Sequence, residues 1–345
     1  MGKFIILLVS MLLITACGGG GGGNHGGDND NGNDSGNESL IITTDNMQEV
    51  AATTLSTVTD ITGIGTSFTT LSVTASDAPY HAVSSRDLLK RQLEQVRELL
   101  TGKMSRQLSA QTVPAATENC DNAGGTLDVT YQDADNNGKL SAGDRFDFHY
   151  QNCRDNALEI TTNGRITLRV TEVEGDVVNE IPPYTFGGKL DIDELNIVDN
   201  RNGDSSTSNG DIGFNLSTND NVVFNFKFSG NAIADTQGSI TNTLRDYQLL
   251  QTENRSTGEY LIGGNDDVQG TGIGGTVNFQ IPDGQPLQGV GNDYPSSGRV
   301  DITGKASKLL VTAVDSTRVQ LTLDSNNDGI TDSSQEVTWA ELLDD

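Results

Sequence analysis

The sequence is poor in cations and in aromatic residues, and the shortage of cations removes whole classes of function. It holds 21 Lys and Arg against 48 Asp and Glu, which gives a net charge of -27. Binding to nucleic acid or to an anionic lipid surface requires clustered cations, so neither is predicted as a partner. So acidic a chain suits a protein that takes up cations, or one that stays soluble at high salt.

Recognisable catalytic motifs are also missing. The chain contains no G-x-S-x-G, no HExxH and no P-loop sequence. Its three histidines, His25, His81 and His149, have no partner motif for nucleophilic or acid–base chemistry. His25 is interpreted as solvated and His149 as a half-buried strand residue. The sequence therefore predicts no enzyme and no catalytic residue.

A long apolar run is absent, and the short one at the start is typical of an export signal. Phe4 to Ile14 follows a single positive charge and is too short for a membrane-spanning helix of about 20 residues. Leu13 to Cys17 (LITAC) resembles a bacterial lipobox, which implies cleavage after residue 16 and acylation of Cys17, for example with palmitate. Gly18 in place of Asp then implies the outer membrane, with its periplasmic and surface faces left open. The alternative is a plain signal peptide with a chance cysteine.

Residues 17–40 are predicted to form a flexible tether behind the lipid. Gly18 to Gly23 is an unbroken glycine run, and the residues that follow to Ser39 are almost all Gly, Asn, Asp and Ser. Such a segment cannot bury apolar surface, and about 22 residues of it reach ~25 Å. The remaining chain is expected to contain a helical segment over 41–115 and a β domain over 116–345.

Only two cysteines remain besides Cys17. Export places Cys120 and Cys153 in an oxidising compartment, so they are predicted to pair. A reactive thiol is the alternative.

Two helices are predicted before the sheet. Residues 45–60 place Met47, Val50, Ala51 and Leu55 on one side. Ser84 to Asp87 resembles a capping box, and a helix is expected to run from there to about Leu108. Its apolar stripe is formed by Leu89, Leu93, Val96, Leu100 and Met104. The stripe is interpreted as a packing face, with binding to a partner as the alternative.

After Cys120 the apolar residues alternate with polar ones, which is typical of antiparallel strands with one buried face. Representative runs are Leu127 to Tyr131, Phe146 to Tyr150, Val222 to Phe228 and Val319 to Leu323. Glycines such as Gly164, Gly188, Gly210 and Gly230 are expected to separate the strands. The predicted fold is mainly β: a large antiparallel meander, built as a curved sheet, sandwich or open barrel, with the two N-terminal helices packed on it.

One segment carries the spacing of a calcium loop. In Asp133 to Asp144 (DADNNGKLSAGD), oxygens at positions 1, 3 and 5 would converge on a hard cation and Gly138 at position 6 permits the turn. The predicted ligands are Asp133, Asp135, Asn137, the Lys139 carbonyl, Ser141 and Asp144. Asp144 stands where Glu is usual, as in dockerin-like loops, and strands flank the loop. An ion-free Asn/Gly turn is the alternative.

A second segment, Asp324 to Asp332 (DSNNDGITD), resembles the loops of thrombospondin type 3 repeats. Its predicted ligands are Asp324, Asn326, Asp328, the Ile330 carbonyl and Asp332. Position 12 falls on Gln335, so Glu336 would have to shift by one residue to bind. An ion-free turn is again the alternative, and Asp199 to Asp204 is a weaker match that is interpreted as plain loop.

Taken in order, these features resemble a group of Gly-rich lipoproteins of Gram-negative bacteria. The residues that carry the resemblance are the lipobox, Cys120 with Gly124-Gly125, the first loop, Cys153, Pro286 to Gly289, Tyr294 to Gly298 and the closing DSNNDG…TWAEL. The resemblance implies an envelope location and no particular activity.

We therefore expect a non-enzymatic lipoprotein, bound to the membrane through its lipid, with one or two calcium ions and a structural or binding role. Its protein, glycan or lipid partner is left open. A carrier of an apolar ligand, similar to lipoprotein-chaperone half-barrels, is the second hypothesis, and a carbohydrate-active enzyme is the third.

Overall fold

The computed structural model describes residues 39–62, 96, 113–120, 124–155, 159–291 and 293–343. The chain divides into two units, Met1–Ser35 and Gly36–Asp345, and all the described residues belong to the second. The predicted signal peptide, Cys17, the tether as far as residue 38 and the predicted helix over 84–108 except Val96 lie outside these ranges.

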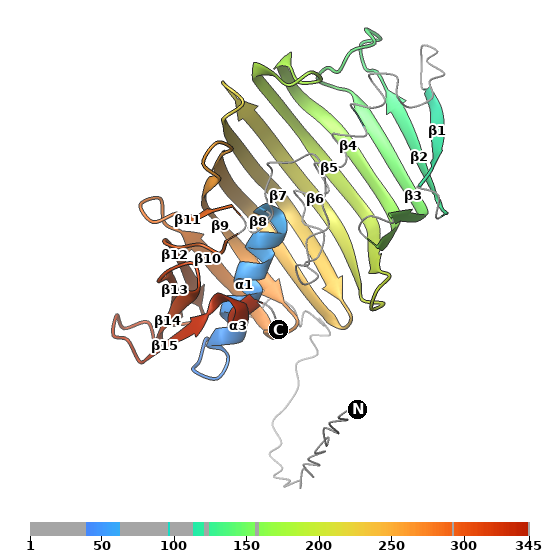
Figure 1. Ribbon diagram of the computed structural model, residues 1–345. Helices are drawn as coiled ribbons and strands as arrows, with labels where there is room; N and C mark the ends of the chain where they lie inside the picture. Colours follow the sequence, from blue (N-terminus) through green and yellow to red (C-terminus); the bar gives the residue numbers. More distant parts are fainter. Residues whose placement is uncertain are drawn as a thin grey trace, which may run out of the picture. The chain divides into compact units, whose positions relative to one another are not determined.

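In the described part of the chain, fifteen strands form one open antiparallel sheet, and nearly every strand pairs with its neighbour in the sequence (Figure 1). The mainly β meander predicted from the alternating pattern is thus confirmed. The order is β1-β2-β3-β4-β5-β6-β7-β8-β9-β10-β12-β13-β14-β15, and β11 pairs beside it with β9. The strands are β1 (Val113–Asn119), β2 (Thr126–Gln132), β3 (Arg145–Asp155), β4 (Ile160–Asp176), β5 (Ile181–Asp199), β6 (Ser205–Thr218), β7 (Val223–Gln237), β8 (Ile240–Asn254), β9 (Glu259–Gly270), β10 (Gly275–Ile281), β11 (Leu287–Val290), β12 (Arg299–Gly304), β13 (Ser307–Ala313), β14 (Arg318–Asp324) and β15 (Ser333–Thr338).

Because consecutive strands alternate in direction, the connections alternate between the two ends of the strands. We call end A the end that carries the β2–β3, β4–β5, β6–β7 and β8–β9 connections. End B carries the β7–β8, β9–β10, β12–β13 and β14–β15 connections.

One face of the sheet is the hydrophobic core, and the alternation of side chains produces it. On β3, Phe146 and Phe148 are fully buried, while Asp147 between them and His149 after them are only partly buried. The same pattern recurs on β13 and β14. Each Å² of apolar surface removed from water stabilises the folded state by ~25 cal/mol. This contribution is the main one that holds such a sheet together.

Two helices are described. α1 (Met47–Thr62) corresponds to the helix predicted over 45–60 and contacts β8, β9, β13 and β14 (Figure 1). α3 (Trp339–Leu343) follows β15, and its buried Trp339 donates through Nε1 to the carbonyls of Pro295 (3.1 Å) and Asp315 (3.0 Å). Val96 is helical and buried, but the rest of the second predicted helix lies outside the described residues. The expected pair of N-terminal helices on the sheet is therefore not confirmed.

The prediction that glycines separate the strands is wrong at four positions. Gly164, Gly188, Gly210 and Gly230 lie inside β4, β5, β6 and β7, so these strands run to 14–19 residues. Two of the glycines make room for aromatic rings on the next strand. A Cβ at Gly188 would lie 2.7 Å from the Phe214 ring, and one at Gly230 would lie 2.6 Å from the Tyr247 ring.

Gly164 and Gly210 belong to a row of β-bulges that runs from β3 to β9, with a regular pairing only between β7 and β8. The strand pairing shifts register at each of these bulges. Glycines with positive φ lie on one side of the shift, and a Cβ on any of them would come within 2.3 Å of a backbone oxygen of the next strand: Gly125, Gly164, Gly210 and Gly264. Bulges bend a sheet and increase its twist, so this row bends the sheet along one line.

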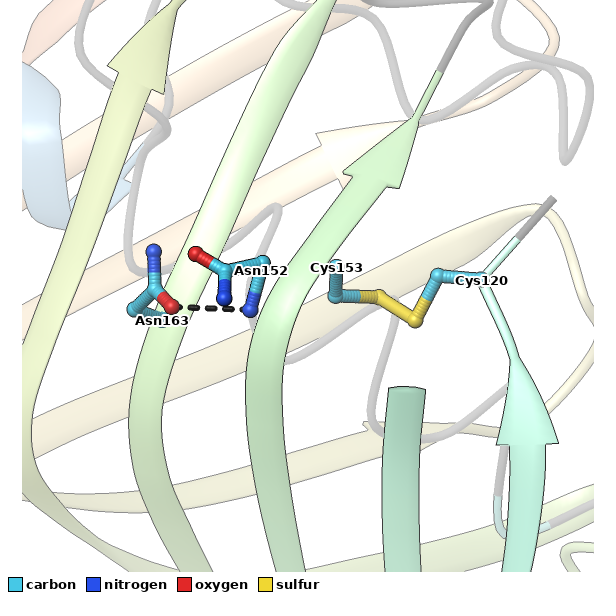
Figure 2. The surroundings of a disulfide bond; sticks show 4 residues. All are labelled: Cys120, Asn152, Cys153 and Asn163. Atoms are coloured by element: carbon cyan, nitrogen blue, oxygen red, sulfur yellow. Dashed lines mark hydrogen bonds between the residues drawn. A yellow bond between two sulfur atoms is a disulfide. The ribbon is translucent and has the colours of Figure 1, made fainter. Parts of the chain in front are cut away.

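Asparagine side chains support the strained residues opposite these glycines. Asn152 and Glu194 have φ of 50° and 48°, which is uncommon for residues with a Cβ. Asn163 Oδ1 accepts a hydrogen bond from the Asn152 amide (2.8 Å, Figure 2), and Asn209 Oδ1 accepts one from the Glu194 amide (2.7 Å). Each asparagine directly precedes a bulge glycine, so these Asn-Gly pairs are bulge elements and not hairpin turns.

A buried carboxyl group lies on the apolar face of β9. Asp266 on β9 is 2% exposed, and its Oδ1 accepts from the amides of Arg245 (3.2 Å) and Asp267. Its Oδ2 has no hydrogen-bond partner. Burial raises the pKa of Asp266 to about 9, and the nearby carboxylates of Asp267 and Asp246 add to the rise while the two amide donors oppose it.

Gly210→Ala should destabilise the sheet far more than Gly203→Ala, although both glycines have positive φ. A Cβ at Gly210 would lie 2.2 Å from the Ala232 carbonyl, whereas a Cβ at Gly203 meets nothing within 4 Å. We expect a loss of ~1 kcal/mol at Gly203 and at least ~2 kcal/mol more at Gly210. Urea unfolding of both variants tests this, and equal losses would contradict the close approach.

Asp266 should make the protein less stable as the pH rises from 5 to 8. Its pKa is raised in the folded state, so the folded chain holds a proton that the unfolded chain loses above about pH 4. Unfolding free energy should then fall by at most ~1.4 kcal/mol per pH unit, and Asp266→Asn should remove this slope. Asp267→Asn, which changes the neighbouring charge, is the control. Thermal unfolding across this pH range is the measurement, and equal slopes in all three proteins would refute the assignment.

Candidate metal centre

The loop that joins β2 to β3 at end A folds around its own carboxylates. Asn136 and Gly138 have φ of 57° and 70°, which closes the turn. Asp133 accepts from the amides of Asn137 (3.3 Å) and Gly138 (2.7 Å). Asp135 Oδ1 also accepts from the Asn137 amide (3.2 Å), and Asn137 Oδ1 accepts from the Lys139 amide (2.6 Å). Side chains at positions 1, 3 and 5 are thus turned inward.

Asp144, at position 12, is fully buried, and the hydrogen bonds of its carboxylate close the loop. Its carboxylate accepts from the amides of Ala134 (3.0 Å) and Ser141 (2.9 Å) and from the Tyr131 hydroxyl (3.1 Å). The loop is also joined to β4, because the Val170 amide donates to the Asp144 carbonyl (2.8 Å). A buried charge this well hydrogen-bonded fixes the loop to the sheet.

Three carboxylates of this loop converge. Asp133, Asp135 and Asp144 each offer an oxygen, and these three oxygens lie within 4.8 Å of one another. The other predicted ligands are nearby in the chain but differently engaged. The Lys139 carbonyl accepts a long hydrogen bond from Tyr131 (3.4 Å), and Ser141 Oγ donates to Asp144 Oδ1 (3.4 Å). Three convergent carboxylate oxygens are the ligands that hard divalent cations prefer.

The pKa values around this loop follow from the same contacts. Desolvation acts to raise the pKa of Asp133, but the amide of Gly138 and the other donors of the loop outweigh it and hold the pKa below its usual range. Desolvation, followed by the charges of Asp144 and Asp133, raises the pKa of the Tyr131 hydroxyl, which therefore stays a proton donor. Tyr131 was not predicted as part of the site, although it is the last alternating residue of the strand before the loop.

The β14–β15 loop repeats the same network at end B. Asp324 accepts from the amides of Asp328 (3.1 Å) and Gly329 (2.7 Å), as Asp133 does at the same positions of the first loop. Asn326 Oδ1 accepts from the Asp328 amide (3.0 Å), and Asp328 Oδ1 accepts from the Ile330 amide (2.8 Å). The two loops therefore have one local structure, on opposite ends of the sheet.

The second loop is nevertheless closed differently. Asp332 accepts from the amide (2.8 Å) and hydroxyl (2.6 Å) of Ser325, the residue that corresponds to Ala134. Asp332, at position 9, thus accepts the hydrogen bond that corresponds to the one accepted by Asp144, at position 12 of the first loop. Glu336 lies on β15 and pairs with Arg318 (3.0 Å). The one-residue shift that Glu336 would need to bind an ion in this loop is therefore not seen. Among the residues that the structure describes, only the first loop brings three carboxylates together.

Two other acidic turns are neutralised by arginine. Asp199 is buried and pairs with Arg201 (2.8 Å), and Asp315 pairs with Arg318 (2.6 Å). Hydrogen bonds from these guanidiniums lower the pKa of both carboxyls. The turn over 199–204 is therefore held by its arginine. Within the described part of the chain, no such ion pair reaches the carboxylates of either calcium-type loop.

The predicted pairing of Cys120 with Cys153 is confirmed. The two residues form a disulfide with a Cα–Cα distance of 5.1 Å (Figure 2). The bond joins the residue after β1 to β3 across the start of β2, beside the bulge at Asn152. It therefore fastens the edge of the sheet.

His149 lies on the partly exposed face of β3, where its Nδ1 is 3.3 Å from Gln151 Nε2. This position agrees with the interpretation of His149 as a half-buried strand residue. His25 and His81 lie outside the described residues.

A pocket at end A adjoins the first loop. It has a volume of about 40 Å³ and is lined mainly by apolar residues, namely Val96, Leu140, Val177, Val178, Tyr184, Phe186 and Leu216, together with Glu180. Leu140, at position 8 of the loop, is partly buried and packs against the hydrophobic core.

No helix among the described residues is long and apolar enough to cross a membrane. Comparison of the chain with protein-family models, with curated proteins and with solved structures gives no match, so the resemblance to Gly-rich lipoproteins stays a prediction that rests on the quoted residues.

Proposed function

We propose that this protein is a non-enzymatic lipoprotein of the bacterial outer membrane, held by a lipid on Cys17, whose β sheet is stiffened by calcium. The observation that supports calcium most directly is the convergence of Asp133, Asp135 and Asp144. The role proposed is structural or one of binding at the cell envelope.

The comparison with the arginine-closed turns supports an ion in the first loop. Three carboxylates within 4.8 Å repel one another, and the net charge of -27 adds to the cost. Asp199 and Asp315 each pair with a guanidinium, which neutralises their charge. A divalent cation would serve the first loop in the same way, and the inward-facing oxygens at positions 1, 3 and 5 suit calcium.

The second loop supports a weaker site. It has the same inward-facing oxygens at Asp324, Asn326 and Asp328 but is closed by Asp332, without a third convergent carboxylate. We therefore rank the first loop above the second.

The packing of a second helix on the sheet belongs to the same proposal. Val96 is helical, 2% exposed and lines a pocket with Tyr184 and Phe186 of β5 and Leu216 of β6. The placement of Val96 supports the predicted second helix packed on the sheet.

A carrier of an apolar ligand stays the second candidate, and the pocket beside Leu140 does not by itself support it. The pocket beside Leu140 holds about 40 Å³, whereas sites for small molecules usually have ~300–1,000 Å³. It is large enough for about one water molecule.

Calcium should raise the thermal stability of the domain modestly. Extracellular loops of this kind bind at ~10⁻⁴–10⁻³ M, which contributes ~0.4–1.4 kcal/mol per site at ~1 mM calcium. Asp133→Ala with Asp135→Ala should remove the share of the first site, and Asp324→Ala with Asp328→Ala the smaller share of the second. Titration calorimetry and melting with and without chelator, on a chain that lacks residues 1–38, are the measurements. Absence of calcium heat together with an unchanged melting temperature would leave both loops as ordinary turns.

Cys17→Ala should abolish acylation and release the protein into the soluble fraction. Each buried CH₂ of an acyl chain contributes ~0.8 kcal/mol to anchoring, so removal of several chains removes membrane retention. Labelled palmitate incorporation and fractionation of the two proteins test this. A wild type without label, or a variant that still sediments with membranes, would contradict the anchor.

A further inference from the structure

The start of the described chain is fixed to end B of the sheet. Ser39 bridges to Thr276, and the Leu40 amide donates to the Thr276 carbonyl (2.9 Å). The Lys305 amide in turn donates to the Leu40 carbonyl (2.6 Å), and the Ile42 amide donates to Ser307 Oγ (2.9 Å). Thr276, Lys305 and Ser307 all belong to the connections of end B or adjoin them, so Ser39, the first described residue, lies at this end.

Three exposed isoleucines lie at the same end. Ile41 follows the attachment point and is 51% exposed. Ile240 begins β8 and is 49% exposed, and the β7–β8 connection is bound to the β9–β10 connection by hydrogen bonds between Thr241 and Thr271. Ile330 lies in the β14–β15 loop and is 67% exposed. From β8 to β14 there are five strand steps, so the row extends over roughly 24 Å.

Exposed aliphatic residues are not unusual by themselves, and end A also has them, namely Ile181 (57%), Val222 (37%), Val290 (49%) and Val314 (41%). What distinguishes end B is the attachment of the chain. About 22 residues separate Cys17 from Ser39, and a flexible segment of this length reaches ~25 Å on average. A lipid on Cys17 would therefore be joined to the sheet at end B, through a segment whose average reach is of this order.

We propose that end B is the membrane-facing end of the protein and that Ile41, Ile240 and Ile330 enter the interfacial layer of the bilayer. This inference rests on the proposed lipid anchor. The contact needs apolar surface and no cluster of cations, so it is compatible with a zwitterionic lipid surface and with the acidic chain. A lipid anchor raises the effective concentration of these side chains at the bilayer surface. Side chains that would bind too weakly alone can then insert.

Depth-dependent quenching in vesicles tests the orientation. The full acylated protein is inserted into phosphatidylcholine vesicles, with an environment-sensitive fluorophore on Ile330→Cys or, as the matched control, on Ile181→Cys. Lipids brominated on the acyl chains should lower the fluorescence at position 330 at least about twofold and leave position 181 unchanged. Ile41→Ser with Ile240→Ser should weaken the quenching at position 330, because part of the apolar contact is lost.

The outcomes separate this inference from the anchor. Protein that stays on the vesicles without quenching at position 330, or with equal quenching at 330 and 181, overturns the orientation while the anchor stands. Protein that does not stay on the vesicles overturns the anchor, and the orientation with it.

Discussion

The structure depends on keeping one face of a very long sheet apolar while its strands twist. Side chains alternate with a strict period of two, so a slip of one residue would turn every apolar side chain of a strand toward water. Strands of up to 19 residues accumulate twist, and the row of bulges from β3 to β9 bends them at one level without losing the apolar face. The bulge glycines are what this bending requires, because neighbouring carbonyls occupy the place of their Cβ atoms.

The alternating pattern made most of the fold predictable. It identified one buried face, antiparallel pairing and strands in sequence order, since these follow from local periodicity. Strand length was not predictable in the same way. Asn163-Gly164 and Asn209-Gly210 have the composition of turns. The asparagine of each pair nevertheless accepts a hydrogen bond from a backbone amide on the preceding strand. Only the contact between strands distinguishes such a bulge from a turn, and that contact is not encoded in the local sequence.

The candidate site was predictable to a similar degree. The spacing of Asp133, Asp135 and Asn137 follows a backbone geometry, and the geometry is present in both loops. The closing residue was harder to predict, because Asp332 and Asp144 occupy different positions of their loops and still accept from the equivalent amide. The buried Asp266 was not predicted either: it is in phase with Ile262 and Val268 of β9, but a carboxyl group is rarely placed on an apolar face, and the neighbouring Asp267 is only partly buried.

Sequential pairing of strands has a consequence for how such a protein folds and changes. Each strand meets a partner that is close in the sequence, so the entropy cost of closing each loop is small and ordering can propagate from one hairpin to the next. Energetically the sheet is close to a one-dimensional array, in which each hairpin interacts mainly with its neighbours. Such an array can be lengthened by inserting a hairpin without changing how the other strands pair. Thr162-Asn163-Gly164-Arg165-Ile166 on β4 and Ser208-Asn209-Gly210-Asp211-Ile212 on β6 share the pattern that the duplication of one hairpin would leave.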